Sequence, residues 1–430
     1  MEGPCSPLKS PASSERWPRL SDPLSPGPSP ARGEGGKGVG QVPGFQGLGT
    51  LPPNSILVLL LMLALAWGMA QIPLARAQDF AQVVPGRPLV FPEDGGAHPD
   101  YRTEWWYITG WLRDVAGRER GFQVTFFRVG TGIGRGNPSR FAPRQLILAH
   151  AAIADPALGQ LIPAERAERA LAPLAGADAG QTRAWLRDWE LSLSDDRYHT
   201  HVATDAFDLD LTLIPPGPPV LNGQAGFSQK GPQATQASYY YSRPQLAVSG
   251  RLRLAEEEEA VTGLAWLDHE WSSEILAADA AGWDWIGINL HEGGSLMAFR
   301  MRDREAKALW TAGTLVEGSS AAGRGPEGSA AQDGTGEDGA RKGKGSARHL
   351  APEEVRFKPG RRWQSPRTGK SYPVEWELTI SGRSWRLVPL MDDQELDSRR
   401  SSGVIYWEGA ARLLEGEREI GRGYLEMTGY

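Results

Sequence analysis

Short runs in which polar and apolar residues alternate recur along the chain beyond residue 80. Residues 208–213 read Asp-Leu-Asp-Leu-Thr-Leu, a period of two that is typical of a strand with one buried face. Residues 239–241 and 404–407 are rich in aromatic and β-branched residues, which also favour strands. The clearest helix-like stretch is residues 164–172, rich in Ala, Glu and Arg and stopped by Pro173. The pattern predicts an all-β fold with a short helix at 164–172.

Three sequence blocks occur twice, in the same order. The pairs are residues 105–112 and 283–290, 189–193 and 376–380, and 241–270 and 406–430. A repeat of this kind indicates two domains of one architecture, which we place at residues 85–272 and 273–430. Many short strands per copy are typical of closed or nearly closed barrels, which can hold one lipophilic ligand. Residues 318–346, rich in Gly, Ala, Ser and charge, predict a disordered insertion in the second copy.

The last pair of blocks differs in its chemistry. Residues 263–267 align with residues 423–427, which sets Asp268-His269-Glu270 opposite Thr428-Gly429-Tyr430. Acid–base residues would then occur in one copy only. We therefore predict one functional site per chain, at the junction of the two domains.

The N-terminal part has the composition of a leader. Residues 1–53 are rich in Pro, Gly and Ser, which predicts a disordered segment. Residues 54–77 contain an apolar run at 56–66 and end in Ala75-Arg76-Ala77, the pattern of a signal peptide cleaved after Ala77. A signal peptide seldom has so long a segment ahead of its apolar run. The alternatives are that translation starts later than Met1 or that residues 56–70 stay as an uncleaved membrane anchor. In each case we expect a periplasmic or secreted protein.

Composition narrows the classes of partner. The 430 residues carry 46 basic and 52 acidic side chains, a net charge of −6, which disfavours a nucleic-acid partner. Cys5 is the only cysteine, so the chain can form no internal disulfide framework or zinc–thiolate site. The many Trp residues indicate aromatic-lined interiors. We expect a lipophilic small molecule as the partner.

Several motifs together resemble one family. They are Thr103-Glu104-Trp105-Trp106-Tyr107, Trp266-Leu267-Asp268-His269-Glu270-Trp271-Ser272, Gly282-Trp283-Asp284-Trp285, Tyr406-Trp407-Glu408-Gly409-Ala410 and residues 421–430. Over nearly all of residues 90–430 the chain resembles the AttH / carotenoid 1,2-hydratase (hydroxyneurosporene synthase) family, and within it the branch labelled secreted hydrolases. The resemblance implies two tandem lipocalin-like β-barrel domains with a site near their interface. It leaves the substrate open.

The segment Trp266–Trp271 is the strongest candidate for the site. If it is the last strand of the first barrel, alternation directs Asp268 and Glu270 to one face and His269 to the other. Residues two apart on a strand are roughly 7 Å apart, so two such carboxyl groups under an indole cannot both ionise cheaply. We expect Asp268 to be a protonated acid that adds a proton to an alkene, with Glu270 or His269 activating water. Glu104 is the second candidate for the acid.

Aromatic residues near this segment are candidates for substrate binding: Trp105, Trp106, Trp266, Trp271 and Tyr241. Their faces would stabilise a carbocation. Two other interpretations stay open at this point. Opening Trp pairs of a strand more often pack in a core, and the Trp266–Trp271 run could be a hydrogen-bonded plug that closes the barrel. Glu408 and Glu426 are expected to be solvated or ion-paired.

Other chemistries have weaker support. The chain has no Gly-x-Ser-x-Gly motif, so a serine nucleophile is not indicated. His199 and His201 would share a strand face but lack an obvious third metal ligand, and the Gly-rich residues 130–136 lead into no helix. We therefore expect no cofactor and no metal. The leading hypothesis is a hydratase-type lyase acting on a polyene or isoprenoid-like substrate. The alternatives are a non-catalytic carrier and a hydrolase that uses a carboxylate-activated water.

Overall fold

The computed structural model describes residues 80–133, 137–318 and 347–430. The predicted leader, signal peptide and nearly all of the predicted insertion lie outside these residues. These described residues belong to one compact unit. Apart from the 3₁₀ helices η1 (Glu93–Gly95) and η2 (Pro352–Glu354), every described element is a strand, and no described helix has the length and apolar character needed to cross a membrane.

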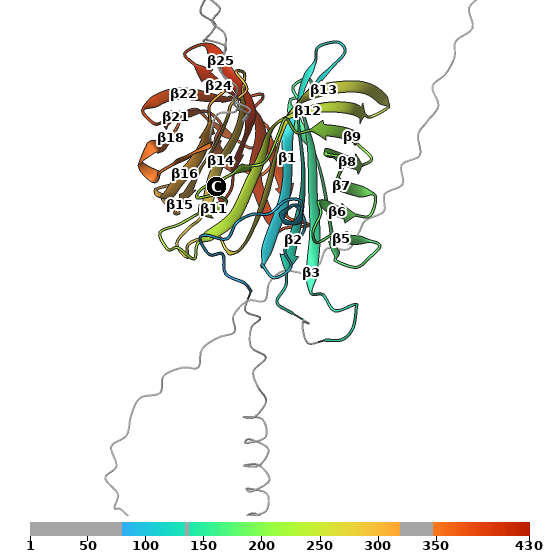
Figure 1. The fold of residues 1–430 in the computed structure, drawn as a ribbon. Coiled ribbons are helices and arrows are strands. Elements are labelled where there is room, and N and C mark those ends of the chain that lie inside the picture. The colour runs from blue at the N-terminus through green and yellow to red at the C-terminus, as the bar shows by residue number, and fades with distance from the viewer. Residues whose placement is uncertain (1–79, 134–136, 319–346) are drawn as a thin grey trace, which may run out of the picture. The chain divides into compact units, whose positions relative to one another are not determined.

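The first barrel is a 13-stranded antiparallel sheet in which β1 joins β13, so that the first and last strands of this half pair along their length (Figure 1). The sheet runs β4-β3-β2-β1-β13-β12-β9-β8-β7-β6-β5, with β10 and β11 beside β12. Its edge strand β4 contacts β6, which nearly closes the barrel. The strands are β1 (Thr103–Asp114), β2 (Glu119–Gly130), β3 (Gln145–Asp155), β4 (Gln160–Arg169), β5 (Ala175–Ala177), β6 (Arg183–Leu186), β7 (Trp189–Ser194), β8 (Arg197–Ala203), β9 (Phe207–Ile214), β10 (Val220–Leu221), β11 (Phe227–Gln229), β12 (Ala237–Leu254) and β13 (Glu257–Glu274).

The second barrel repeats this plan with ten strands. Its order is β17-β16-β15-β14-β25-β24-β22-β21-β18, with β23 beside β24, and here β14 joins β25. Strands β16 and β18 contact each other and nearly close it. The strands are β14 (Gly282–Leu290), β15 (Ser295–Arg302), β16 (Ala308–Val316), β17 (Ala347–Leu350), β18 (Val355–Pro359), β21 (Trp376–Ile380), β22 (Arg383–Pro389), β23 (Glu395–Ser398), β24 (Val404–Glu415) and β25 (Arg418–Met427); a separate hairpin is β19 (Arg362–Gln364) with β20 (Ser371–Pro373). The predicted all-β fold with two barrels is confirmed.

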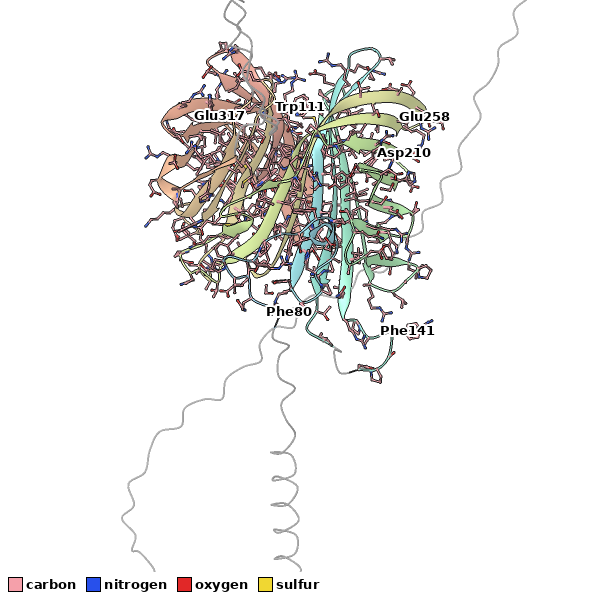
Figure 2. The ribbon with its side chains drawn as sticks, viewed as in Figure 1. Phe80, Trp111, Phe141, Asp210, Glu258 and Glu317 are labelled. Carbon is pink, nitrogen blue, oxygen red and sulfur yellow. The ribbon has the colours of Figure 1, made fainter. Side chains whose placement is uncertain are left out.

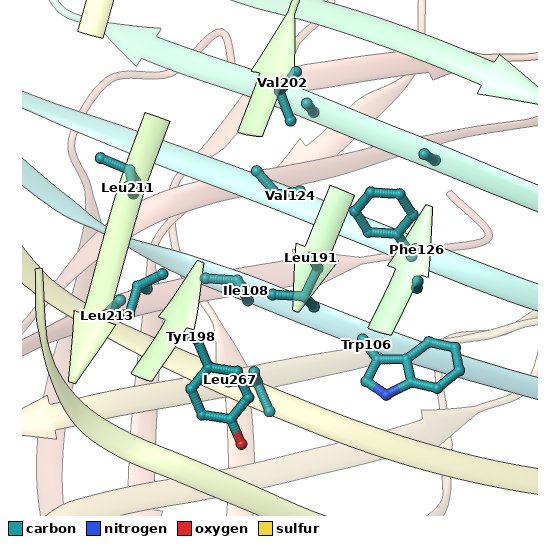
Figure 3. Close-up of a cluster of buried hydrophobic side chains, with 14 of the residues drawn as sticks. Trp106, Ile108, Val124, Phe126, Leu191, Tyr198, Val202, Leu211, Leu213 and Leu267 are labelled. Carbon is teal, nitrogen blue, oxygen red and sulfur yellow. The ribbon is translucent and has the colours of Figure 1, made fainter. Parts of the chain in front are cut away.

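The alternation of side chains along each strand explains which of its faces is exposed. Along β9, buried residues alternate with partly or fully exposed ones, as residues 208–213 predicted. Leu211, Leu213 and Leu191 pack in the interior of the first barrel (Figure 3). Strand β1 is buried on both faces, because one face lines the first barrel and the other packs against the second.

The predicted helix at 164–172 is wrong. Strand β4 occupies most of this stretch and pairs with β3. The first pair in the register is Leu146 with Arg169, and the last is Asp155 with Gln160. Local helix propensity differs by less than about 1 kcal/mol per residue between Ala and most others, so a full ladder of strand hydrogen bonds overrides it. Pro163 lies within β4 and is tolerated because β4 is an edge strand.

The two barrels approach each other closely at Gly121 of β2. A Cβ atom there would lie 2.6 Å from Tyr424 Oη and 2.7 Å from Ala410 Cβ, both in the second barrel. Nearby, Arg422 Nη1 donates to Glu119 Oε1 at 2.6 Å, and its guanidinium lies 4.7 Å from the Trp111 ring centroid. Apolar packing and these charged contacts hold the interface together.

We expect Leu211→Ala to destabilise the protein by about 2–5 kcal/mol, because Leu211 is fully buried and its loss leaves a cavity in the first barrel. Val115→Ala is the matched control, since Val115 is 91% exposed in the β1–β2 turn. Denaturant unfolding followed by Trp fluorescence measures both. Equal stabilities of the two variants would contradict this description of the core.

Candidate functional site

Strand β13 positions the predicted site between the two barrels. It pairs with β1 on one side and β12 on the other, so its side chains are fixed in register. Leu267 and Trp271 belong to the core of the first barrel, whereas Trp266 belongs to a third cluster shared with the second barrel. The predicted alternation is confirmed: Asp268 and Glu270 share the outward face with Trp266, and His269 points inward.

Asp268 is buried and accepts three hydrogen bonds from neutral groups. Tyr240 Oη donates to Oδ2, and Ser242 Oγ and Trp266 Nε1 donate to Oδ1, each at 2.6 Å. Burial raises the pKa of Asp268 from 3.8 to about 7, although these three hydrogen bonds lower it; the charge of Glu270 raises it further. No cation pairs with Asp268 among the described residues. A carboxyl group of this kind can donate a proton near neutral pH.

Glu270 differs because it has a cation. Lys230 Nζ lies 2.7 Å from Glu270 Oε1, and Ser238 Oγ donates to the same oxygen. Lys230 is itself buried and lies 4.5 Å from the Tyr240 ring centroid and 4.3 Å from that of Phe299. Glu270 thus has a cationic partner that Asp268 lacks, so the two neighbouring acids have different environments.

The second barrel contributes two further carboxyl groups. Burial raises the pKa of Glu426 to about 7, and the charges of Glu270 and Asp268 add to the rise, whereas a hydrogen bond from Trp283 lowers it. Burial and the charge of Glu426 raise the pKa of Glu408 well above its usual value. Glu408 is 1% exposed and forms no ion pair within the described part of the chain. The prediction that Glu408 is solvated or ion-paired is therefore wrong.

Two reciprocal contacts show how the barrels are related. Trp111 Nε1 donates to Gly423 O at 3.0 Å, and Asn289 Nδ2 donates to Ala265 O at 3.1 Å (Figure 2 labels Trp111). Trp111 and Asn289 are both the seventh residue of the repeated opening block. The contacts are therefore related by an approximate two-fold axis, which makes Ala265 and Gly423 equivalent.

This equivalence shifts the closing strands by two residues from the alignment predicted above. Asp268 then corresponds to Glu426, and Ser242, its partner on β12, corresponds to Glu408, the partner of Glu426 on β24. The prediction that acid–base residues occur in only one copy is wrong, because the sequence alignment followed glycine identities that are out of register. Both barrels supply acids to one interface.

Buried polar atoms without partners lie along the same interface. They belong to the cross-strand pairs Tyr107–Thr125 and Thr109–Gln123 and to Glu408 Oε1; within the described residues none forms a hydrogen bond of good geometry, although Tyr107 and Gln123 lie close enough to Glu408 to lower its pKa. Unpaired buried polar groups are costly, so their clustering marks where water or polar parts of a ligand bind.

Two clefts open on the described surface. A cleft of about 190 Å³ adjoins the site, with Thr109, Trp111 and Trp266 among its lining residues. Trp266 both lines it and donates to Asp268, so one side chain separates the cleft from the acid. A larger cleft of about 1040 Å³, beside Glu165 and Arg399, contains none of the predicted site residues. We assign the site to the smaller cleft because Trp266, which lines it, donates to Asp268.

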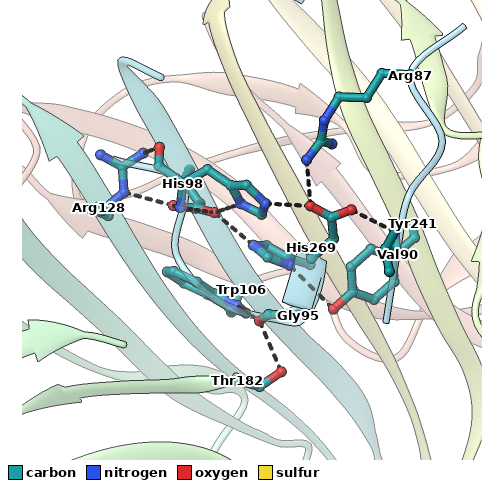
Figure 4. A network of polar contacts seen from close by, with 11 residues as sticks. Arg87, Val90, Gly95, His98, Trp106, Arg128, Thr182, Tyr241 and His269 are labelled. Atoms are coloured by element: carbon teal, nitrogen blue, oxygen red, sulfur yellow. Dashed lines mark hydrogen bonds and ion pairs between the residues drawn. The ribbon is translucent and has the colours of Figure 1, made fainter. Parts of the chain in front are cut away.

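The inward face of β13 carries a separate network inside the first barrel (Figure 4). Glu104 Oε1 lies 2.7 Å from His98 Nδ1 and 2.9 Å from His269 Nε2, and Arg128 Nε donates to Glu104 Oε2 at 2.6 Å. Asp94 Oδ1 lies 2.9 Å from His98 Nε2. Glu104 and His269, predicted as partners of Asp268, therefore lie on the other side of the strand.

Ion pairs and hydrogen bonds set the pKa values of the groups in this network. Burial alone would raise the pKa of Glu104, but hydrogen bonds from His269 and His98 and the charge of Arg128 hold it well below its usual value. Burial opposes charging of His98, yet bonds to Asp94 and Glu104 raise its pKa, whereas burial lowers the pKa of His269. Glu104 is thus a paired carboxylate, unlike Asp268.

The predicted aromatic residues divide between the two faces. Trp106, Trp271 and Tyr241 lie in the first barrel's core; Trp106 stacks on His269 with ring centroids 4.7 Å apart. Trp266 and the half-buried Trp105 belong to the interface cluster. Sequence reasoning missed Lys230, Tyr240, Trp285 and His98, because only tertiary pairing brings them to the site. His199 and His201 of β8 gain no third ligand among the described residues.

We expect Asp268→Asn to change how stability depends on pH. The folded protein keeps the Asp268 proton between its ordinary pKa of 3.8 and about 7, whereas the unfolded chain loses it. The free energy of unfolding of the wild type should therefore fall as pH rises through this window, by at most about 1.4 kcal/mol per pH unit. The Asn variant lacks this loss, so its stability relative to wild type should improve toward neutral pH.

Urea unfolding of both proteins between about pH 4 and 8 measures this difference. Asp210→Asn, at an exposed position of β9 labelled in Figure 2, is the control and should follow the wild-type curve. A constant difference between wild type and Asp268→Asn across the window would rule out the raised pKa.

Comparisons with known proteins agree with this architecture. The profile of the AttH-like family matches residues 82–430. A solved structure from Nitrosomonas europaea, provisionally assigned as AttH, is 45% identical, covers 82% of this chain and 100% of its own, and has a TM-score of 0.71. Kievitone hydratase from Nectria haematococca is 15% identical over 82% of this chain and 96% of its own, with a TM-score of 0.56, and shares the fold. No curated protein sequence matches the chain. This chain, with its two lipocalin-like barrels, belongs to the AttH-like family.

Proposed function

We propose that the protein is a cofactor-free, hydratase-type enzyme that adds water to a C=C bond of a lipophilic polyene or isoprenoid-like substrate. The observation that carries this proposal is Asp268, an acid with a pKa of about 7 buried between two barrels among aromatic side chains. Kievitone hydratase, which shares the fold, is a hydratase by name, so the fold is compatible with such chemistry.

Protonation of the alkene begins the proposed reaction. The Asp268 O–H bond breaks and its proton forms a C–H bond with one alkene carbon, which leaves a carbocation on the other and a carboxylate on Asp268. Trp285 Nε1 donates to Tyr240 Oη at 3.1 Å, and Tyr240 donates to Asp268, so this chain stabilises the carboxylate that forms. The faces of Trp266 and Trp285 suit stabilisation of the cation.

Addition of water completes the proposed reaction. A water oxygen bonds to the cationic carbon and gives up one proton to a carboxylate, for which Glu270 is the best candidate because it neighbours Asp268 and is paired with Lys230. Return of that proton to Asp268 restores the site. No step needs an oxidant, a metal ion or a nucleotide. The buried polar atoms of Tyr107, Gln123 and Glu408 are suited to orient water.

We further propose that the protein is exported to the periplasm or secreted after cleavage behind Ala77, as the N-terminal pattern predicts. Expression of the full chain in a Gram-negative host, followed by fractionation and intact-mass measurement, tests this. The mature protein is expected to begin at Gln78. A full-length protein retained with the membrane would support the anchor alternative instead.

Asp268→Asn is expected to lower hydration by about 10²- to 10⁴-fold, because the variant cannot donate the proton. The assay incubates the protein with acyclic polyenes such as lycopene and detects products heavier by one water molecule. Asp210→Asn is the control, since Asp210 is exposed on β9 and outside the interface. Unchanged turnover in Asp268→Asn would rule out the acid role, and polyene binding without turnover by the wild type would favour the carrier alternative.

A further inference from the structure

The inward-facing network of the first barrel contains the donor set of a metal centre. His98 Nδ1, His269 Nε2 and a carboxylate oxygen of Glu104 lie within 4.8 Å of one another. Two imidazoles and one carboxylate form one of the standard three-ligand sets for catalytic zinc, with a fourth position open to water. We propose that these three residues bind one divalent transition-metal ion, with Zn²⁺ as the best match.

Each of the three ligands is held through its other polar atom. Asp94 Oδ1 lies 2.9 Å from His98 Nε2, Tyr241 Oη lies 3.2 Å from His269 Nδ1, and Arg128 Nε donates to Glu104 Oε2 at 2.6 Å. Outer contacts of this kind fix the tautomer and orientation of metal ligands. They leave His98 Nδ1 and His269 Nε2 both directed at Glu104 Oε1, so that the three ligand atoms lie within 4.8 Å of one another.

Aromatic rings hold both imidazoles in place. His98 stacks on Trp271 with centroids 3.7 Å apart, and His269 stacks on Trp106 at 4.7 Å. The stacking thereby orients the plane of each ring.

The geometry must adjust by a small amount to take the ion. Zinc with ligands at about 2.0–2.2 Å separates its ligand atoms by about 3.3 Å in a tetrahedral site. Glu104 Oε1 is 2.7 Å from one imidazole nitrogen and 2.9 Å from the other, and the three ligand atoms lie within 4.8 Å of one another, so the two imidazole nitrogens must approach each other by up to about 1.5 Å to share one ion. His98 can supply this movement, because it lies in the loop between η1 and β1 rather than in a strand.

An ion can reach this centre from solvent. The side chain of His98 is 11% exposed, whereas those of Glu104 and His269 are fully buried. His98 is therefore the one of these three ligands whose side chain reaches solvent. This centre lies on the opposite face of β13 from Asp268, so the inference is independent of the proposed hydration.

Metal titration of the full mature protein tests the inference. Chelator-treated protein is expected to bind one equivalent of Zn²⁺ or Co²⁺ by calorimetry and elemental analysis, and Co²⁺ should give the visible bands of a four-coordinate site. Glu104→Gln should abolish stoichiometric binding. His150→Asn is the matched control, because His150 is a buried histidine of β3 outside the centre, and it should bind as the wild type does.

Two further variants keep the test decisive if Glu104→Gln does not fold. Tyr241→Phe retains the ring and should weaken metal binding about 10- to 100-fold without loss of the fold. The double variant His199→Asn/His201→Asn removes the exposed histidine pair of β8 and should leave binding intact. Absence of stoichiometric binding by the wild type, or binding lost only in the double variant, would overturn the inference.

Discussion

The pleat of β13 is the constraint on which the rest of the molecule depends. Because β13 is paired on both edges, its side chains must alternate between the interior of the first barrel and the second barrel. The four consecutive residues from Asp268 to Trp271 therefore lie alternately in two different environments. A register shift of one residue would exchange the side chains on the two faces of β13. Asp268 would then lie in the aliphatic core, and Leu267 would face the carboxyl groups.

Much of the fold could be predicted from the sequence, because strand alternation and repeated blocks are local signals. The pattern of residues 208–213 and the repeated opening strands lead directly to two β-barrels. Local signals failed at β4, where helix-favouring residues lie in an edge strand paired with β3. They also misaligned the closing strands by two residues, since glycines recur there and only hydrogen-bonded register distinguishes the possibilities.

The candidate site could be predicted only in part. Asp268 and Glu270 were found because adjacent acids between Trp residues are conspicuous in one strand. Lys230 pairs with Glu270 and Tyr240 donates to Asp268, yet both reach these acids from other strands or loops. Glu104 was identified as an acid from its neighbours, and only the structure shows that Arg128 and two histidines keep it ionised. Proton affinity depends on such three-dimensional partners rather than on residue type.

The reciprocal contacts of Trp111 with Gly423 and of Asn289 with Ala265 have an evolutionary consequence. An approximate two-fold axis inside one chain is the geometry that an isologous homodimer acquires when its two subunits become covalently joined. In such an ancestor, the carboxyl groups now represented by Asp268 and Glu426 would have been the same residue, facing its own copy across the axis. After fusion, the two positions could mutate independently. One half could then acquire Ser242 where the other has Glu408. A symmetric cluster of acids could in this way become an asymmetric site, with different side chains on its two sides.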